Sequence, residues 1–266
     1  MPSFREGEIL LDTYQILSFL GKGTFGEVYK VRVLRGRYAG RVLALKVATD
    51  PETVEFLRRE VQTLLLFNHP HIISMISYMY RKDRNELYVL YELMDVGDLK
   101  DYVQRKGRLS EEEALGVLFH VAKGLDYLHT RGYIHGDVKP QNIFGKRVMK
   151  NILWKLGDFG LVRVRGSQTV LDVKGTVGYI APEVFRNELR RSSDIFSLGC
   201  VLLFMLTGET PFGGDIKKNK AVEYSIPQHV SERTQRLLTK MLEPDPSKRF
   251  KTAGELIEYL IKERMV

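Results

Sequence analysis

The feature of this chain that most constrains its fold is a change in the spacing of apolar residues near Leu99. Short apolar runs separated by Gly, Asp and Asn precede that point, and such runs are typical of strands. The predicted strands span residues 15–20, 27–33, 42–47 and 87–93. One helix is predicted among them, at 51–67, where apolar residues recur at helical spacing. After Leu99 the spacing becomes helical, so we expect an α+β fold whose strands are concentrated in its first third.

Two capping boxes mark predicted helix starts in the later part of the chain. Ser110 with Glu113 begins an amphipathic run that extends to Leu128, and Thr252 with Glu255 begins the last predicted helix. No internal repeat, low-complexity tract or Pro/Ser-rich linker separates the strand-rich part from the helical part. The two parts are therefore expected to belong to one continuous unit.

We expect this unit to be a single domain over residues 1–266, with a smaller part at 1–93, a larger part at 94–266 and a hinge at 92–97. At 266 residues the chain is long for one domain. Its 44% hydrophobic and 28% charged residues are ordinary for a globular protein with a sizeable core.

The net charge of +8 indicates an anionic partner, such as nucleotide phosphates, an acidic substrate, nucleic acid or a membrane surface. Nucleic acid is not expected, because no compact basic run with interleaved aromatic residues is present. The longest apolar run, 198–206, is too short to span a bilayer, and residues 1–14 contain no apolar signal segment. The single Cys200 excludes an internal disulfide. We expect a cytoplasmic protein without a membrane segment.

A glycine-rich segment, GKGTFGEV, places Gly21, Gly23 and Gly26 between two predicted strands. Glycines let backbone N–H groups approach phosphates closely. The same spacing occurs in dinucleotide-binding domains, but there the third glycine begins a helix, whereas a strand is predicted here at 27–33. For this motif alone, a glycine-rich hairpin without a ligand is the open alternative.

Lys46 lies within an apolar predicted strand, in the segment ALKV at 44–47. A buried ammonium group without an anionic partner is costly, so this lysine is expected to pair with a carboxylate or a phosphate. Glu60, on the predicted helix, is the candidate carboxylate. For Glu60 taken alone, a solvated helix charge is an equally open alternative.

The segment HGDVKPQN at 135–142 places Asp137, Lys139 and Asn142 in one short loop. A carboxylate can accept the proton of an attacking hydroxyl, an ammonium group can neutralise a transferred phosphoryl group, and an amide oxygen can bind Mg²⁺. Asp158, in the segment LGDFG, supplies a second oxygen ligand. Together these residue types predict phosphoryl transfer.

With these motifs in this order, the chain resembles the protein kinase family over nearly its whole length. Three later segments extend the resemblance: GTVGYIAPE at 175–183, DIFSLG at 194–199 and DPSKRF at 245–250. Glu183 and Arg249 match a buried ion pair of that family. The resemblance implies a bilobal fold, with a small, mainly antiparallel β lobe carrying one helix and a larger, mainly helical lobe.

By this resemblance, Asp137 is the catalytic base, and Lys46 contacts the α- and β-phosphates of ATP while pairing with Glu60. Asn142 and Asp158 are the metal-binding residues. The implied cofactors are ATP and Mg²⁺, with Mn²⁺ as an alternative to Mg²⁺.

Two further matches imply a protein serine/threonine kinase. Lys139 stands two residues after the base, as in serine/threonine kinases, and Thr176 matches a threonine that contacts this aspartate and lysine. Other matching positions surround the nucleotide. They are Gly21, Gly23 and Gly26 at the phosphates, Val28, Ala44 and Phe144 around the adenine, the backbone of Glu92 and Met94 at its edge, Tyr91 at the gatekeeper position behind it, and Asp98 at the ribose.

The chain departs from the family at Gly136, which replaces the arginine of the usual HRD and makes this an HGD, or non-RD, sequence. That arginine normally receives a phosphate on the activation loop, where Ser167 and Thr169 are the candidates. Arg163 remains as one cation, but Phe56 occupies a helix position that often supplies another. We therefore expect activity that does not depend on activation-loop phosphorylation. Activation by a protein partner is the alternative.

Two other functions are compatible with the sequence. One is a pseudokinase, a nucleotide-binding scaffold on the same fold, although the residues named above for phosphoryl transfer and ion pairing are all present. The other is a kinase of small molecules or lipids, although the three later segments resemble enzymes with protein substrates. The sequence does not indicate the physiological substrate or the oligomeric state.

Overall fold

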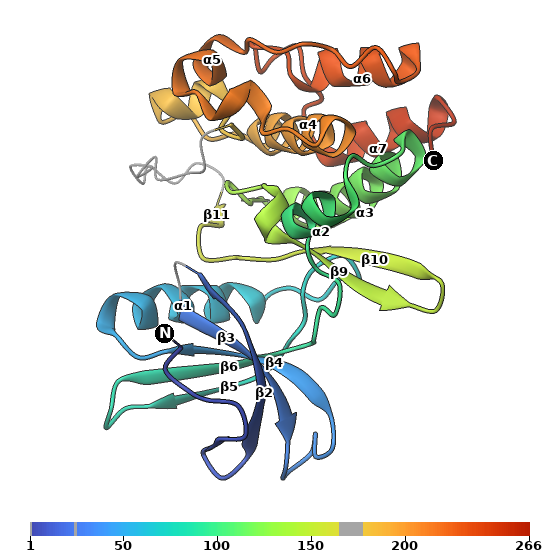
Figure 1. Ribbon diagram of the computed structural model, residues 1–266. Helices are drawn as coiled ribbons and strands as arrows, with labels where there is room; N and C mark the ends of the chain where they lie inside the picture. The colour runs from blue at the N-terminus through green and yellow to red at the C-terminus, as the bar shows by residue number, and fades with distance from the viewer. Residues whose placement is uncertain (1, 24–25, 165–177) are drawn as a thin grey trace. The chain divides into compact units, whose positions relative to one another are not determined.

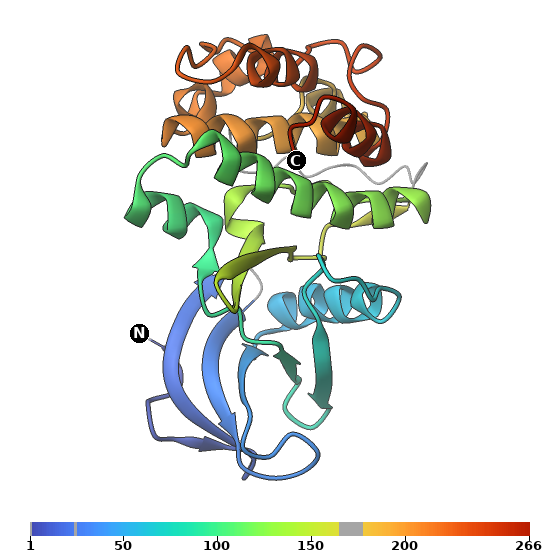
Figure 2. The same ribbon diagram turned by 90° about the vertical axis from the view of Figure 1, so that its right-hand side faces the viewer.

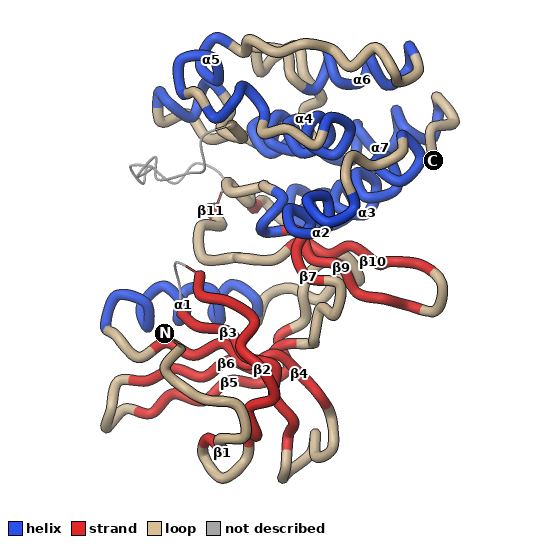
Figure 3. The backbone as a smooth tube through the Cα atoms, viewed as in Figure 1, coloured by secondary structure: helices blue, strands red, loops and turns tan. Residues whose placement is uncertain are grey.

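The computed structural model describes residues 2–23, 26–164 and 178–266. The chain divides into two compact units, Met1–Asp95 and Val96–Val266, and each is described by itself. Figure 3 shows that strands predominate in the first unit and helices in the second. The predicted α+β fold class is confirmed, with an antiparallel sheet and one helix in the first unit and mainly helices in the second.

The first unit contains a six-stranded sheet in the order β1-β2-β3-β4-β6-β5, in which every neighbouring pair is antiparallel (Figure 1). The strands are β1 (Ile9–Leu10), β2 (Tyr14–Gly23), β3 (Gly26–Val33), β4 (Val42–Ala48), β5 (Met75–Arg81) and β6 (Glu86–Tyr91). All four predicted strands are present. β5 lies at the edge of the sheet and was not predicted.

One face of this sheet carries the apolar core of the first unit. On β3, Tyr29, Val31 and Val33 are buried, whereas Lys30 and Arg32 between them are more exposed. This alternation follows from the two-residue period of a strand. Leu43, Leu45 and Leu90 belong to the same buried cluster.

The helix of the first unit, α1 (Pro51–Leu64), lies beside the sheet (Figure 2). Asp50 caps it by accepting a hydrogen bond from the Thr53 backbone N–H, and Pro51 occupies the first turn, where its missing N–H costs nothing. The helix buries Val54, Leu57, Glu60, Val61 and Leu64. It ends three residues before the predicted end at residue 67, with Leu65 as its C-cap.

The second unit is built around long helices. Its α-helices are α2 (Leu99–Lys106), α3 (Glu111–Thr130), α4 (Arg191–Thr207), α5 (Ile216–Ala221), α6 (Glu232–Met241) and α7 (Ala253–Lys262). Its strands and 3₁₀ turns are β7 (Gly97–Asp98), β8 (Tyr133–Ile134), η1 (Pro140–Asn142), β9 (Ile143–Val148), β10 (Asn151–Leu156), β11 (Arg163–Val164), η2 (Pro182–Arg186) and η3 (Pro211–Gly214). β7, β9 and β10 form one antiparallel sheet, and β8 pairs with β11.

The predicted capping box at the start of α3 is present. The Ser110 side chain accepts from the Glu113 N–H, and the Glu113 carboxylate accepts from the Ser110 N–H. The second predicted box is only half formed. Thr252 accepts from the Glu255 N–H, but the Glu255 carboxylate accepts from the N–H of Lys251 rather than from that of Thr252.

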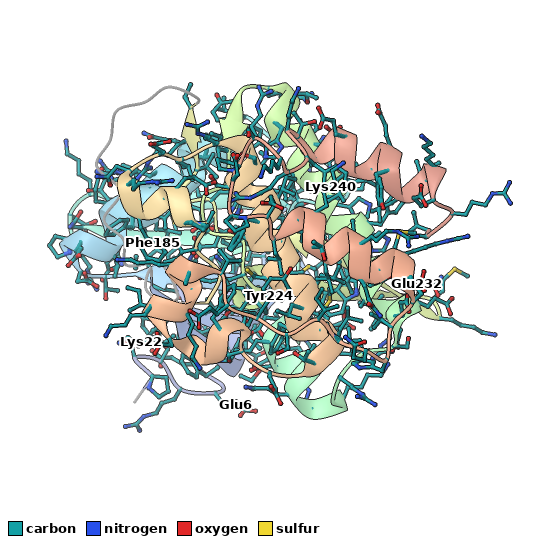
Figure 4. All side chains as sticks on the ribbon, turned by 90° about the horizontal axis from the view of Figure 1, so that it is seen from above. Glu6, Lys22, Phe185, Tyr224, Glu232 and Lys240 are labelled. Atoms are coloured by element: carbon teal, nitrogen blue, oxygen red, sulfur yellow. The ribbon has the colours of Figure 1, made fainter. Side chains whose placement is uncertain are left out.

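Helix α6 illustrates how the helices bury one side. Leu237, Leu238 and Met241 are buried, whereas Glu232 and Lys240 are exposed. The last two are labelled near the ends of this helix in Figure 4. Within the described ranges, no helix has the length and apolar composition that a membrane span requires.

A buried ion pair holds the core of the second unit together. Arg249 donates to both carboxylate oxygens of Glu183, at 2.8 and 3.0 Å, and both side chains are fully buried. The Ser193 hydroxyl also donates to Glu183, at 2.7 Å, and the Arg249 guanidinium lies 4.8 Å from the Phe196 ring centroid. The remaining guanidinium bonds go to backbone carbonyls. The two charges are therefore bidentate and well hydrogen-bonded, as burial demands.

Replacing Arg249 with methionine is expected to destabilise the protein by about 3–5 kcal/mol, because it leaves the Glu183 carboxylate buried without its counter-charge. Urea titration of the full chain measures this. The control is Arg236→Met, which removes an exposed arginine whose pair with Glu232 is 3.5 Å long. The control should change the free energy of unfolding by no more than about 1 kcal/mol. Equal effects of the two variants would contradict the importance of the buried pair.

Candidate catalytic site

In the first unit, Lys46 on β4 forms an ion pair with Glu60 on α1, with 2.6 Å between Nζ and Oε2. The Glu60 side chain is 3% exposed and that of Lys46 is 14% exposed. The alternative interpretation of Glu60, as a solvated charge on the helix surface, is therefore wrong. The predicted pairing is present, and it places a charged donor beside a carboxylate that water scarcely reaches.

The register of the sheet places four predicted residues on the face that carries this ion pair. Val28 lies opposite Lys46, and Ala44 lies opposite Tyr91. Residues directly opposite each other, and residues two apart on one strand, point to the same side of a sheet. Val28, Ala44 and Tyr91 therefore share the side of the sheet from which Lys46 reaches Glu60.

The glycine-rich segment forms the end of the β2–β3 hairpin, where Gly23 pairs with Gly26. Gly26 has a φ of +119°, and a Cβ at this position would lie 2.3 Å from the Val47 carbonyl oxygen, so only glycine fits. Among the described residues, no atom lies within 4 Å of a Cβ built on Gly21 or Gly23. The described part of the protein thus gives no steric reason for glycine at those two positions, whereas close approach of a ligand to the backbone would give one.

Glu92 and Met94 follow the end of β6. The Glu92 backbone N–H donates to the Ser74 carbonyl at 3.1 Å, and its carboxylate accepts from the Ser74 N–H at 2.9 Å. Glu92 is buried and Met94 is half-buried. These paired bonds fix the backbone at Glu92, the residue predicted to lie at the adenine edge.

In the second unit, the loop after β8 brings Asp137, Lys139 and Asn142 together. The Lys139 ammonium lies 2.7 Å from Asp137 Oδ2. The Asn142 amide nitrogen donates to both the Asp137 carbonyl and Asp137 Oδ2, each at 2.9 Å. These contacts orient the Asp137 carboxylate and place a cation beside it.

The Asn142 amide is also suited to bind a metal ion. Because its nitrogen makes both hydrogen bonds to Asp137, its Oδ1 is the remaining group, and in the described part of the chain Oδ1 accepts no hydrogen bond. Asp158 follows β10 with a φ of +60°, a left-handed conformation that is uncommon outside glycine. An amide oxygen and a carboxylate are hard oxygen ligands of the type that Mg²⁺ prefers, so these two residues fit the predicted ion.

The buried Asp194 carboxylate, at the start of α4, fixes the loop backbone. It accepts from the N–H of His135 at 2.9 Å and from the N–H of Gly136 at 2.8 Å. His129 Nε2 lies 2.9 Å from the same carboxylate, and the Ala253 N–H donates to the His129 Nδ1 at 3.2 Å. Asp194 and His129 therefore connect the loop to α3, α4 and α7.

His135 is held as a neutral imidazole. Its Nε2 lies 3.1 Å from the Gly157 carbonyl, which only accepts, and its Nδ1 accepts from the Asp137 N–H at 3.3 Å. Complete burial lowers the pKa of His135, which agrees with this tautomer. Its ring also packs edge-on against Phe159, with 5.3 Å between the centroids. The histidine thus ties the loop to the Asp158–Phe159 segment.

Asp98 and Phe144 are direct partners in the β7–β9 pair. Asp98 also caps α2 by accepting from the Asp101 N–H at 2.9 Å. Burial raises the pKa of its carboxyl group. The second unit therefore brings together Asp98, predicted at the ribose, and Phe144, one of the residues predicted around the adenine.

Sequence patterns did not indicate Asn219, a fully buried residue on α5. Its amide oxygen accepts from the Gly178 N–H at 3.2 Å, and its amide nitrogen donates to the Ile180 carbonyl at 2.9 Å. The Ser197 hydroxyl donates to the Tyr179 carbonyl at 2.7 Å. These bonds hold the backbone before Pro182 and Glu183. Thr176, Ser167 and Thr169, which the sequence also singled out, lie outside the described residues.

Comparison with known proteins shows the family to which this chain belongs. Residues 14–260 match the family model described as "Protein kinase domain". The chain is 33% identical over 262 residues to Serine/threonine protein kinase OSK3 of Oryza sativa subsp. indica, covering 94% of this chain and 50% of that protein. It is 31% identical over 263 residues to Aurora kinase of Saccharomyces cerevisiae, covering 94% of this chain and 69% of that protein. The chain thus spans about half the length of the rice protein.

Glycine is expected to be required at position 136 because of the backbone conformation there. Its φ is +77°, and a Cβ there would lie 3.3 Å from Leu189 Cδ2. Gly136→Ala should therefore destabilise the protein by about 1–2 kcal/mol in urea titration. The control is Gly116→Ala on α3, where a Cβ meets no atom of the described residues within 4 Å and alanine should stabilise by about 0.5–1 kcal/mol. A Gly136→Ala protein as stable as the parent would contradict the requirement.

Proposed function

Because the chain belongs to the protein kinase family, we propose that it transfers the γ-phosphoryl group of ATP to serine and threonine hydroxyls of protein substrates. The single observation that carries this proposal is the group formed by Asp137, Lys139 and Asn142, with its lysine–aspartate distance of 2.7 Å and its two amide bonds to Asp137. The similar rice protein carries the name Serine/threonine protein kinase. We propose further that residues 1–266 act as one catalytic domain.

Asp137 is the proposed catalytic base. The substrate hydroxyl attacks the γ-phosphorus, the bond between that phosphorus and the oxygen bridging to the β-phosphate breaks, and the hydroxyl proton passes to the Asp137 carboxylate. Lys139, already beside this carboxylate, neutralises charge on the transferred group. Asn142 orients the base through its amide nitrogen. The Asp194 contacts that hold the loop backbone support this role, because general bases act from a defined position.

Binding of ATP is assigned to groups of both units. In the first unit, Lys46 is proposed to contact the α- and β-phosphates, and the absence of described atoms within 4 Å of a Cβ on Gly21 or Gly23 supports a phosphate at the hairpin. The shared face of Val28, Ala44 and Tyr91 supports an adenine there, with backbone groups of Glu92 and Met94 as its hydrogen-bond partners. In the second unit, Phe144 is proposed to contact the adenine and Asp98 the ribose.

Asn142 and Asp158 are the proposed ligands of Mg²⁺, with Mn²⁺ as an alternative. The bound ion would neutralise charge on the phosphate oxygens during transfer. The orientation of the Asn142 amide supports this assignment, since its nitrogen is engaged by Asp137. Lys139 and Thr176 are the proposed determinants of serine/threonine specificity.

We propose that this activity does not depend on activation-loop phosphorylation. Gly136 replaces the arginine that would pair with such a phosphate, and its backbone is held instead by Asp194 at 2.8 Å. An activating protein partner is the alternative source of regulation.

Asp137→Asn is expected to lower kcat by about a thousandfold, because the substrate hydroxyl loses its proton acceptor. Transfer from radiolabelled ATP to a peptide array measures this, and calorimetry should find ATP–Mg²⁺ affinity little changed. The control is Asp83→Asn in the exposed β5–β6 turn, which should behave as the parent. Retention of kcat within about tenfold by Asp137→Asn would sink the assignment of the base. A parent chain that binds ATP but phosphorylates no peptide would instead indicate a scaffold, and phosphorylation of small molecules alone would indicate a different substrate class.

The double variant Ser167→Ala, Thr169→Ala is expected to keep kcat within about tenfold of the parent, because too few cations remain to order a phosphorylated loop. Phosphatase-treated parent enzyme serves as the control and should behave in the same way. A hundredfold loss of kcat, on the order of 3 kcal/mol, would show that the loop phosphate is needed.

A further inference from the structure

Two donors bind the two oxygens of one buried carboxylate in the first unit. The Tyr91 hydroxyl donates to Glu60 Oε1 at 2.9 Å, and the Lys46 ammonium donates to Glu60 Oε2 at 2.6 Å. Since each oxygen has its own donor, the tyrosine does not compete with the lysine. The resemblance implied only a steric role for Tyr91, as a large ring behind the adenine.

The antiparallel register of β4 and β6 explains why both donors reach the same helix. Tyr91 lies opposite Ala44, two residues before Lys46 on the neighbouring strand. Side chains two apart share a face, so Tyr91 and Lys46 are diagonal neighbours there. Glu60, on the buried side of α1, meets both. The methyl group of Ala44 adds little bulk beside the tyrosine ring.

Burial makes this hydrogen bond consequential. Tyr91 is 4% exposed and the Glu60 side chain 3% exposed, so little water is available to replace a lost donor. A buried carboxylate oxygen left without its donor carries the full desolvation cost, and hydrogen bonds to charged groups are stronger than neutral ones. Glu60 is therefore held most firmly in the orientation that directs Oε1 to Tyr91 and Oε2 to Lys46.

We infer that Tyr91 is a positioning residue for phosphoryl transfer: its hydroxyl holds Glu60, and through Glu60 it holds the Lys46 ammonium where the phosphates of ATP bind. This inference rests on the proposed function, which assigns the phosphates to Lys46. The hydrogen bond lies wholly within the first unit. It ties α1 to the sheet without any phosphorylated segment, and so complements an activity that is independent of loop phosphorylation.

The test is Tyr91→Phe, which removes one oxygen atom and keeps the ring. Calorimetry should show ATP–Mg²⁺ affinity reduced about tenfold, and kcat/KM for ATP should fall by a similar factor. KM for the peptide substrate should not change. If the hydroxyl had a purely structural role, its loss would lower the fraction of folded enzyme but would not change the ATP affinity of the folded molecules. A weaker ATP affinity together with an unchanged KM for the peptide therefore indicates the positioning role.

Tyr88→Phe is the matched control. Tyr88 lies on the same strand, and its hydroxyl donates to the Glu86 carboxylate at 2.8 Å, but it belongs to the opposite, core face of the sheet. This variant should keep the ATP affinity and the kcat/KM of the parent. An equal loss of ATP affinity in both variants would attribute the effect to any lost hydroxyl on β6 and would overturn the inference.

A double-variant cycle with Glu60→Gln tests whether Tyr91 acts through Glu60. In the Glu60→Gln background, Tyr91→Phe should change ATP affinity less than twofold, compared with about tenfold in the parent. Equal effects in both backgrounds, or an unchanged ATP affinity in the single Tyr91→Phe variant, would overturn the inference.

The same cycle measured on urea unfolding requires neither ATP nor catalysis. Non-additive losses of stability from Tyr91→Phe and Glu60→Gln are expected, and additive losses would overturn the inference. Failure of the proposed function has a different signature: the parent would phosphorylate no peptide, while the coupling between Tyr91 and Glu60 in unfolding would remain.

Discussion

The arrangement of the second unit depends on the Asp194 carboxylate. This buried anion accepts hydrogen bonds from two backbone N–H groups of the loop after β8 and lies beside His129, which in turn accepts from the first residue of α7. A carboxylate that accepts several hydrogen bonds is a rigid anchor, since moving any donor leaves a buried oxygen unsatisfied. Asp137 directly follows these two residues, His135 and Gly136, so its position is set by helices that are distant in sequence. The role proposed for Asp137 as a general base depends on such a fixed position.

The same solution to buried charge recurs in both units. Glu183 takes both guanidinium nitrogens of Arg249, and Glu60 takes one donor on each oxygen. In each case a carboxylate that is costly to bury becomes tolerable because its acceptor sites are filled. The difference lies in what the cation is left to do. Arg249 directs its remaining bonds to backbone carbonyls within the fold, whereas the Lys46 side chain is still 14% exposed, which agrees with the phosphate contact proposed for it.

Much of the fold could be predicted from local pattern, and the exceptions have physical causes. The β5 strand is missing from the prediction because it lies at the sheet edge with half-buried or exposed side chains, so its sequence shows no clear alternation of buried positions. The β9–β10 hairpin turns at Met149, with a φ of +54°, where a glycine or asparagine would normally signal the turn. The prediction of a capping box at Thr252 was half right, because the Glu255 carboxylate accepts from the N–H of Lys251, one residue before Thr252.

What the sequence by itself determined is the family and the α+β fold class, and it singled out the residues proposed for phosphoryl transfer, since these follow from residue types at short fixed spacings. Tertiary structure alone decided which donors complete each buried charge. The Tyr91 hydroxyl reaches Glu60 across 31 residues, and the Asn219 amide reaches Gly178 across 41. No local pattern encodes such pairs, because the side chains meet only after strands and helices have packed and excluded the water that would otherwise satisfy them.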